Sequence, residues 1–100
     1  METAQIKPYG NAIEPLIVEE VERQMQQLPP SLVQYLDAAQ VTAYALNRLP
    51  ALYATSVEGW HRQQQRAKEK MAAEIFMAVR QGLAAVQRDP LKTSTPLMLQ

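Results

Sequence analysis

The placement of proline is the feature that most constrains this chain, because prolines separate its periodic segments rather than interrupting them. Pro29-Pro30, Pro50 and Pro90 bound stretches in which apolar residues recur every three or four positions. Proline lacks an N–H donor and disfavours the α region for the residue before it, so helices tend to end there. No stretch alternates apolar and polar residues for long. The pattern predicts an all-α fold, a small three-to-four-helix domain with a long C-terminal helix, and no strand beyond a short one near residues 52–55.

The first helix is expected to begin at Asn11 and to end before Pro29. The Asn11 side chain can cap the helix while Glu14 reaches back, and Pro15 falls within or just past the first turn. A short turn is expected over residues 31–36. One apolar stripe runs along the helix and consists of Ile13, Leu16, Ile17, Val21, Met25 and Leu28.

Two further helices are predicted. Asp37 repeats the capping pattern and starts a helix over residues 38–49. Thr55 or Ser56 caps the last helix, which runs to Asp89 over about 30 residues, or roughly 45 Å. A helix of this length exceeds what a domain of 100 residues can flank, so we expect it to project or to pair with a second copy.

The chain is expected to form one domain with two loose ends. The domain covers residues 11–88. The two ends are an N-terminal arm at residues 1–10 and a flexible C-terminal tail at 89–100. The absence of cysteine excludes disulfides, thiolate metal sites and thiol nucleophiles. Apolar runs are far shorter than the roughly 20 residues of a spanning helix, and the start lacks an export-signal pattern. We therefore expect a cytoplasmic protein without membrane contact.

Charge is balanced overall but unevenly distributed. Residues 1–37 hold six acids and two bases, whereas residues 38–100 hold eight bases and four acids. Either the two halves attract each other, within a chain or across a dimer, or the basic half meets an anion. The zero net charge disfavours binding to long nucleic acid. A small anion needs only a local cluster of basic residues, and residues 61–70 provide such a cluster.

Enzymatic chemistry has little support in the sequence. The one histidine, His61, stands in the most basic stretch, where a surface position is the usual explanation. The sequence contains no glycine-rich phosphate loop, no nucleophile elbow and no pair of residues with metal-ligand spacing. We therefore expect no catalytic residue, no metal site and no cofactor.

Basic residues line one side of the last predicted helix. Arg62, Arg66 and Lys70 follow Gly59 at intervals of three or four residues, which places them on one face. Arginine matches phosphate oxygens and can also pair two ways with the edge of guanine. The alternative is that these side chains are simply solvated.

Hydroxyl and aromatic residues precede this basic face. Thr55 and Ser56 lie at the start of the helix, where free N–H groups favour a phosphate. Tyr53 and Trp60 flank this point and are suited to stacking on a base. A structural explanation is also open for three of these residues: Thr55 or Ser56 is needed as a helix cap, and Trp60 is a candidate core residue.

Part of the sequence resembles the ComFB family of late competence proteins. The likeness covers roughly residues 9–70. It is strongest in the run Ala45-Leu46-Asn47-Arg48-Leu49-Pro50-Ala51-Leu52-Tyr53-Ala54-Thr55-Ser56, followed by Gly59-Trp60, and extends upstream to Tyr9-Gly10-Asn11-Ala12-Ile13-Glu14 and residues 16–22.

The resemblance implies a mainly helical homodimer rather than an enzyme. For the branches of photosynthetic bacteria it implies a receptor for cyclic dinucleotides, with cyclic di-GMP the best-known ligand and cyclic di-AMP a second. Some family members hold zinc through a cysteine cluster between the first two helices. This chain has Leu32-Val33-Gln34-Tyr35-Leu36 there, so the zinc role is not transferred. We further expect an unknown downstream protein partner.

The residue pattern and the resemblance together predict a ligand site. A cyclic dinucleotide is a two-fold dianion with two bases, and a two-fold dimer offers each half the same contacts. Arginines are expected to engage guanine edges or phosphates, hydroxyls to donate hydrogen bonds, aromatic rings to stack, and the arm to close over the ligand. The predicted ligand-binding residues are Lys7, Tyr9, Arg48, Tyr53, Thr55, Ser56, Trp60, Arg62 and Arg66. The alternative function is a helical homodimeric interaction module with no small-molecule ligand.

Overall fold

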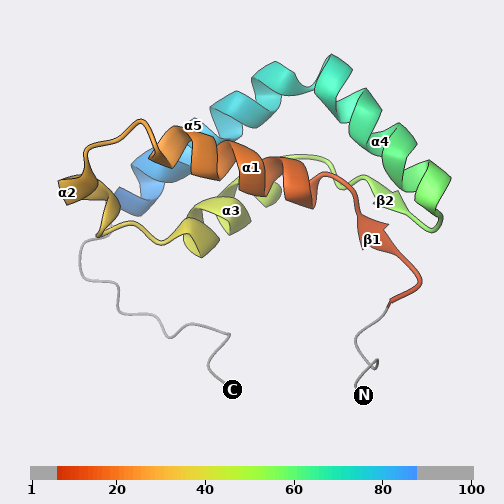
Figure 1. The fold of residues 1–100 in the computed structure, drawn as a ribbon, viewed down its shortest axis with the longest axis horizontal. Coiled ribbons are helices and arrows are strands. Elements are labelled where there is room, and N and C mark those ends of the chain that lie inside the picture. The colour runs from red at the N-terminus through yellow and green to blue at the C-terminus, as the bar shows by residue number, and fades with distance from the viewer. Residues whose placement is uncertain (1–6, 88–100) are drawn as a thin grey trace.

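The computed structural model of the chain describes residues 7–87, and the predicted tail at 89–100 lies outside them. The described part is mainly helical, as the sequence predicts (Figure 1). Its elements are β1 (Gly10–Asn11), α1 (Glu14–Met25), α2 (Pro30–Val33), α3 (Ala38–Leu46), β2 (Tyr53–Ala54), α4 (Val57–Lys70) and α5 (Ala72–Gln87). Within residues 7–87, no helix combines the length and the apolar character needed to cross a membrane.

Helices α1, α3 and α5 pack together around the hydrophobic core (Figure 1). The apolar stripe predicted along the first helix is confirmed, because every member is buried or half-buried. Helix α3 contributes Val41 and Ala45, and α5 adds Ile75, Val79 and Leu83. These three helices form a platform, and α4 and the two strands lie at one end of it.

The predicted helix boundaries are confirmed in part. Asp37 caps α3, because its side chain accepts a hydrogen bond from the Ala39 N–H at 2.9 Å. The prediction that the first helix begins at Asn11 is wrong. Asn11 belongs to β1, and its Oδ1 accepts from the N–H of Leu52 at 2.8 Å and, more weakly, from Ile13 at 3.3 Å. This side chain links two distant segments, and α1 begins only at Glu14.

The expected single long helix is also wrong. It breaks at Met71, where φ is −125° and ψ is 13°, and α4 and α5 meet at an angle there (Figure 1). The physical reason is the different burial of the two halves. Helix α5 returns across α1 and α3 and buries several apolar side chains, whereas α4 buries Ala67 alone and lies beside β2. Because α5 packs on α1 and α3 of its own chain, it does not project as a continuation of α4, and pairing with a second copy stays a prediction. The predicted second helix likewise ends early, at Leu46 rather than residue 49.

Gly82 allows α5 to approach α3 closely. A Cβ atom at this position would lie 3.2 Å from the carbonyl oxygen of Val41 and 3.2 Å from Cδ1 of Tyr44. We expect Gly82→Leu to lower the free energy of unfolding by about 1–3 kcal/mol through overpacking, although leucine is the better helix former. Urea denaturation measures this loss. Gln81→Leu, at an exposed neighbouring position, is the control, and equal stability of the two variants would contradict the packing argument.

Candidate ligand-binding hollow at the two-stranded ribbon

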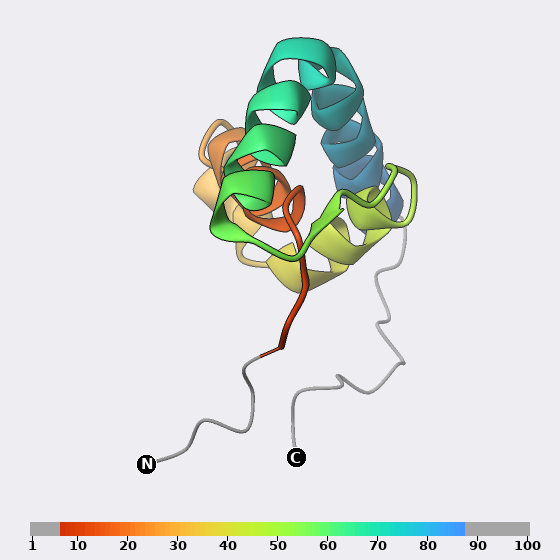
Figure 2. The same cartoon turned by 90° about the vertical axis from the view of Figure 1, so that its right-hand side faces the viewer.

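A short antiparallel ribbon ties the N-terminal arm to the segment that precedes α4. Gly10 pairs with Ala54 and Asn11 with Tyr53, and beyond the ribbon the Ala12 N–H donates to the Leu52 carbonyl at 2.8 Å. Figure 2 looks toward this end, where the strands lie next to the first turns of α4. The short strand predicted near residues 52–55 is present. Its partner is the arm, so residues far apart in the sequence share one surface.

Two adjoining depressions of about 360 and 270 Å³ lie along this ribbon. We call them together the ribbon hollow. Both include Lys7, Tyr9, Gly10 and Trp60. The first is completed by Pro8, Ala54, Thr55, Ser56 and Val57, and the second by Asn11, Glu14, Pro15 and Tyr53.

Three aromatic side chains dominate the ribbon hollow. The rings of Tyr9 and Tyr53 meet edge to face, with centroids 5.9 Å apart and planes at 76°. Both are largely exposed, at 53% and 60%, which leaves ring surface open to a ligand. Trp60 is half-buried and packs against both the core and Gly10. Trp60 is therefore partly a core residue, and the two tyrosines offer the more accessible faces.

The start of α4 supplies hydrogen-bonding groups. Ser56 is the N-cap, and its Oγ accepts from the Gly59 N–H at 2.9 Å. The Ser56 hydroxyl hydrogen remains available to a ligand, and the neighbouring Thr55 is exposed. Glu58 adds a negative charge to the first turn and reduces the attraction of this helix end for an anion.

The four cationic residues predicted to bind the ligand do not lie together in the structure. Lys7 lines the ribbon hollow, whereas Arg48, Arg62 and Arg66 line neither depression in the described part of the chain. The guanidinium carbon of Arg48 lies 3.5 Å from the centroid of the Tyr44 ring, and its Nη1 donates to the Tyr44 carbonyl at 3.3 Å. Arg62 and Arg66 are exposed on α4. The fold thus brings together six predicted site residues: Lys7, Tyr9, Tyr53, Thr55, Ser56 and Trp60.

Sequence reasoning missed the part that Gly10, Asn11, Glu14 and Pro15 take in lining the hollow. The prediction that Asn11 caps the first helix left no place for residues 10–15 in the lining of the hollow. The predicted strand near residues 52–55 was the useful signal, because an isolated short strand needs a partner. Over residues 7–87, no group of three or more His, Cys, Asp or Glu side chains is placed to hold a metal ion.

Gly10 keeps the ribbon in contact with the Trp60 ring. A Cβ atom at Gly10 would lie 2.9 Å from Cζ3 of Trp60, which is too close for both to stay in place. We expect Gly10→Val to displace the indole, to red-shift the tryptophan emission and to cost about 1–3 kcal/mol of stability. Ala73→Val, at an exposed position on α5 outside the ribbon hollow, is the control. An unchanged spectrum and stability for Gly10→Val would contradict the contact.

Comparison with known proteins gives a family match that covers most of the chain. A search of curated proteins finds no match. The sequence profile of the late competence development protein ComFB matches residues 10–90, which includes both strands and every helix of the structure. A match over most of the chain shows the family, and the chain therefore belongs to the ComFB family.

Proposed function

We propose that this protein is a receptor that binds a cyclic dinucleotide, cyclic di-GMP in the first place, at the ribbon hollow. One observation carries the proposal: the ribbon gathers a cation, exposed aromatic rings and hydroxyl groups from two distant segments. Each of these groups suits one part of a nucleotide. Family membership and the resemblance described above support the same ligand class.

Each lining group has a role in this proposal. Tyr9 or Tyr53 stacks on a base, an interaction that tolerates any base because every base has a π-face. Lys7 contacts a phosphate as a point charge. Thr55, Ser56 and the N–H groups at the start of α4 donate hydrogen bonds to phosphate oxygens. The protein binds without catalysing a reaction and needs no zinc or other cofactor.

The two-fold symmetry of the ligand favours a shared site. The two depressions of the ribbon hollow, of about 360 and 270 Å³, lie side by side on one copy. In the proposed complex one copy contacts one half of the ligand. A homodimer with its two-fold axis through the ligand supplies the other half, and it also gives Arg48, Arg62 and Arg66 a second route to the nucleotide. The bound state then signals to a cytoplasmic protein partner.

Titration calorimetry with cyclic di-GMP, cyclic di-AMP and linear pGpG tests the proposal. We expect saturable, selective binding of one cyclic ligand per dimer, in the micromolar range or tighter. Alanine variants of Arg48, Arg62 and Arg66 test the predicted arginine contacts one by one. Unchanged affinity in all three would remove the arginines from the site, and no heat with any nucleotide would overturn the receptor function.

A second candidate is an interaction module without a small ligand. Three exposed apolar side chains, Val18, Val57 and Met77, favour it, with exposures of 43%, 68% and 50%. Each of these side chains lies on a different helix and is a candidate contact point for a partner. The same titration separates the two functions, because this module gives no heat with any nucleotide.

A further inference from the structure

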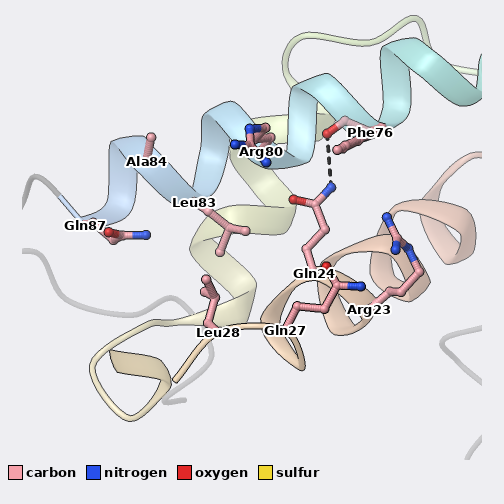
Figure 3. Close-up of a pocket in the computed structure, with 9 residues that line it drawn as sticks. All are labelled: Arg23, Gln24, Gln27, Leu28, Phe76, Arg80, Leu83, Ala84 and Gln87. Atoms are coloured by element: carbon pink, nitrogen blue, oxygen red, sulfur yellow. Dashed lines mark hydrogen bonds between the residues drawn. The ribbon is translucent and has the colours of Figure 1, made fainter. Parts of the chain in front are cut away.

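A separate depression lies between the C-terminal part of α1 and α5 (Figure 3). Figure 1 shows that this part of the two helices lies away from the ribbon end of the molecule. The volume of the depression is about 410 Å³. We call it the α1–α5 groove, and its lining residues include Arg23, Gln24, Leu28, Phe76, Arg80 and Leu83. It shares no residue with the ribbon hollow, so the two surfaces can be occupied at the same time.

The groove combines an apolar base with polar edges. Leu28, in the turn that follows α1, and Leu83 of α5 approach each other (Figure 3), and Leu83 is only 6% exposed. Glutamine and arginine side chains lie around them. The surface therefore suits a ligand that is apolar at one point and polar beside it.

The Gln24 amide oxygen faces the groove and is accessible to solvent. The residue is only 7% exposed, and its Nε2 donates to Glu20 Oε2 at 2.7 Å and to the Phe76 carbonyl at 3.1 Å. These two acceptors fix the orientation of the amide. The amide oxygen has no hydrogen-bond donor within the described residues and turns toward Leu83 (Figure 3). A ligand with an N–H group would satisfy it.

The two arginines of the groove differ in their partners. Arg23 is held by Glu20, through Nη2 to Oε2 at 2.6 Å and Nε to Oε1 at 3.0 Å, and its guanidinium lies 5.9 Å from the Phe76 ring centroid. The hydrogen bonds from Arg23 lower the pKa of Glu20, although partial burial opposes the shift. Arg80 is exposed and forms no ion pair in the part of the chain that the structure describes. One positive charge at the groove is therefore uncompensated.

We propose that the α1–α5 groove binds an extended acidic segment of a partner protein. An apolar side chain of the segment packs on Leu28 and Leu83, a backbone N–H donates to the Gln24 oxygen, and a neighbouring carboxylate pairs with Arg80. An extended segment fits because its backbone N–H groups are free, whereas those inside a helix are occupied. A phosphate group or a nucleic-acid backbone would match Arg80 but offers no N–H group to the Gln24 oxygen.

Titration of the ¹⁵N-labelled full chain with three capped peptides tests this site by NMR. The first carries a leucine-glutamate pair between glycines and serines. The second replaces glutamate by glutamine, and the third is N-methylated at the leucine nitrogen. We expect saturable shifts of the Gln24 side-chain amide and of backbone amides in residues 76–84, with the Trp60 indole signal unchanged. The second and third peptides should each bind at least about tenfold more weakly, since each lacks one polar contact.

Charge reversal provides the matched protein variants. Arg80→Glu should weaken the first peptide at least about tenfold, whereas Lys68→Glu, exposed on α4, should leave its affinity unchanged. Circular dichroism checks that both variants fold. Equal affinity in the two variants, equal affinity for the N-methylated peptide, or no saturable shift would overturn the proposal. Shifts that depend on protein concentration without peptide would assign the groove to a second copy instead, and would also overturn it.

Discussion

Ile17→Ala is expected to lower the free energy of unfolding by about 2–5 kcal/mol, the usual cost of a buried isoleucine truncated to alanine. Ile17 is fully buried near the start of α1 and belongs to the core that α1, α3 and α5 share. Domains of this size are stable by only about 5–15 kcal/mol, so the variant should lose a large part of its stability. Urea denaturation followed by circular dichroism measures the change.

The neighbouring position provides the control. Val18 lies next to Ile17 on α1 but is 43% exposed. Val18→Ala should change stability by no more than about 0.5 kcal/mol, because it removes few contacts and alanine is a good helix former. Similar losses for Ile17→Ala and Val18→Ala would contradict the orientation of α1 in the structure.

Tyr53→Ala is expected to weaken cyclic di-GMP binding by about 5- to 150-fold, since base–aromatic stacking contributes about 1–3 kcal/mol per base. This prediction rests on the proposed function. Tyr53 is 60% exposed, so its removal should leave the fold intact. Tyr53→Phe keeps the ring and should keep most of the affinity. Calorimetry measures both variants against the unchanged chain.

Tyr35→Ala is the matched control for that experiment. Tyr35 is 69% exposed, lies after α2 and does not line the ribbon hollow. Its removal should leave the affinity unchanged. If Tyr53→Ala and Tyr35→Ala behave alike, ring stacking at the ribbon has no part in recognition.

Local sequence signals predicted much of the fold correctly. The apolar stripe of α1 is buried, Asp37 caps α3 and Ser56 caps α4. Each of these features depends on residues a few positions apart, where side-chain spacing and capping chemistry decide the outcome. The short strand predicted near residues 52–55 is also present, at Tyr53–Ala54.

Long-range packing decided the features that the sequence did not predict. No proline or glycine marks the break at Met71, which follows from α5 packing on α1 and α3. Asn11 is of a residue type that often caps helices. Its side-chain oxygen nevertheless accepts a hydrogen bond from the N–H of Leu52, 41 positions away. A capping residue and a bridging residue look the same in the sequence. The difference appears only when the distant partner is in place.

The candidate site was likewise predictable only in the part where its residues lie close together in the sequence. Aromatic and hydroxyl residues close together in the sequence, such as Tyr53 and Ser56, do line one surface. Helical spacing grouped Arg62 and Arg66 with them, but both point to solvent on α4. Arg48 stacks on Tyr44, a contact set by the turn that ends α3 and not visible in motif spacing.

The intrinsic fluorescence of Trp60 tests the central claim most directly. The chain contains one tryptophan, and it lines both depressions of the ribbon hollow. We predict that cyclic di-GMP changes the emission saturably, with the same midpoint as calorimetry, and that linear pGpG at equal concentration does not. Calorimetric binding of cyclic di-GMP without any change in Trp60 emission would place the ligand elsewhere and contradict the account.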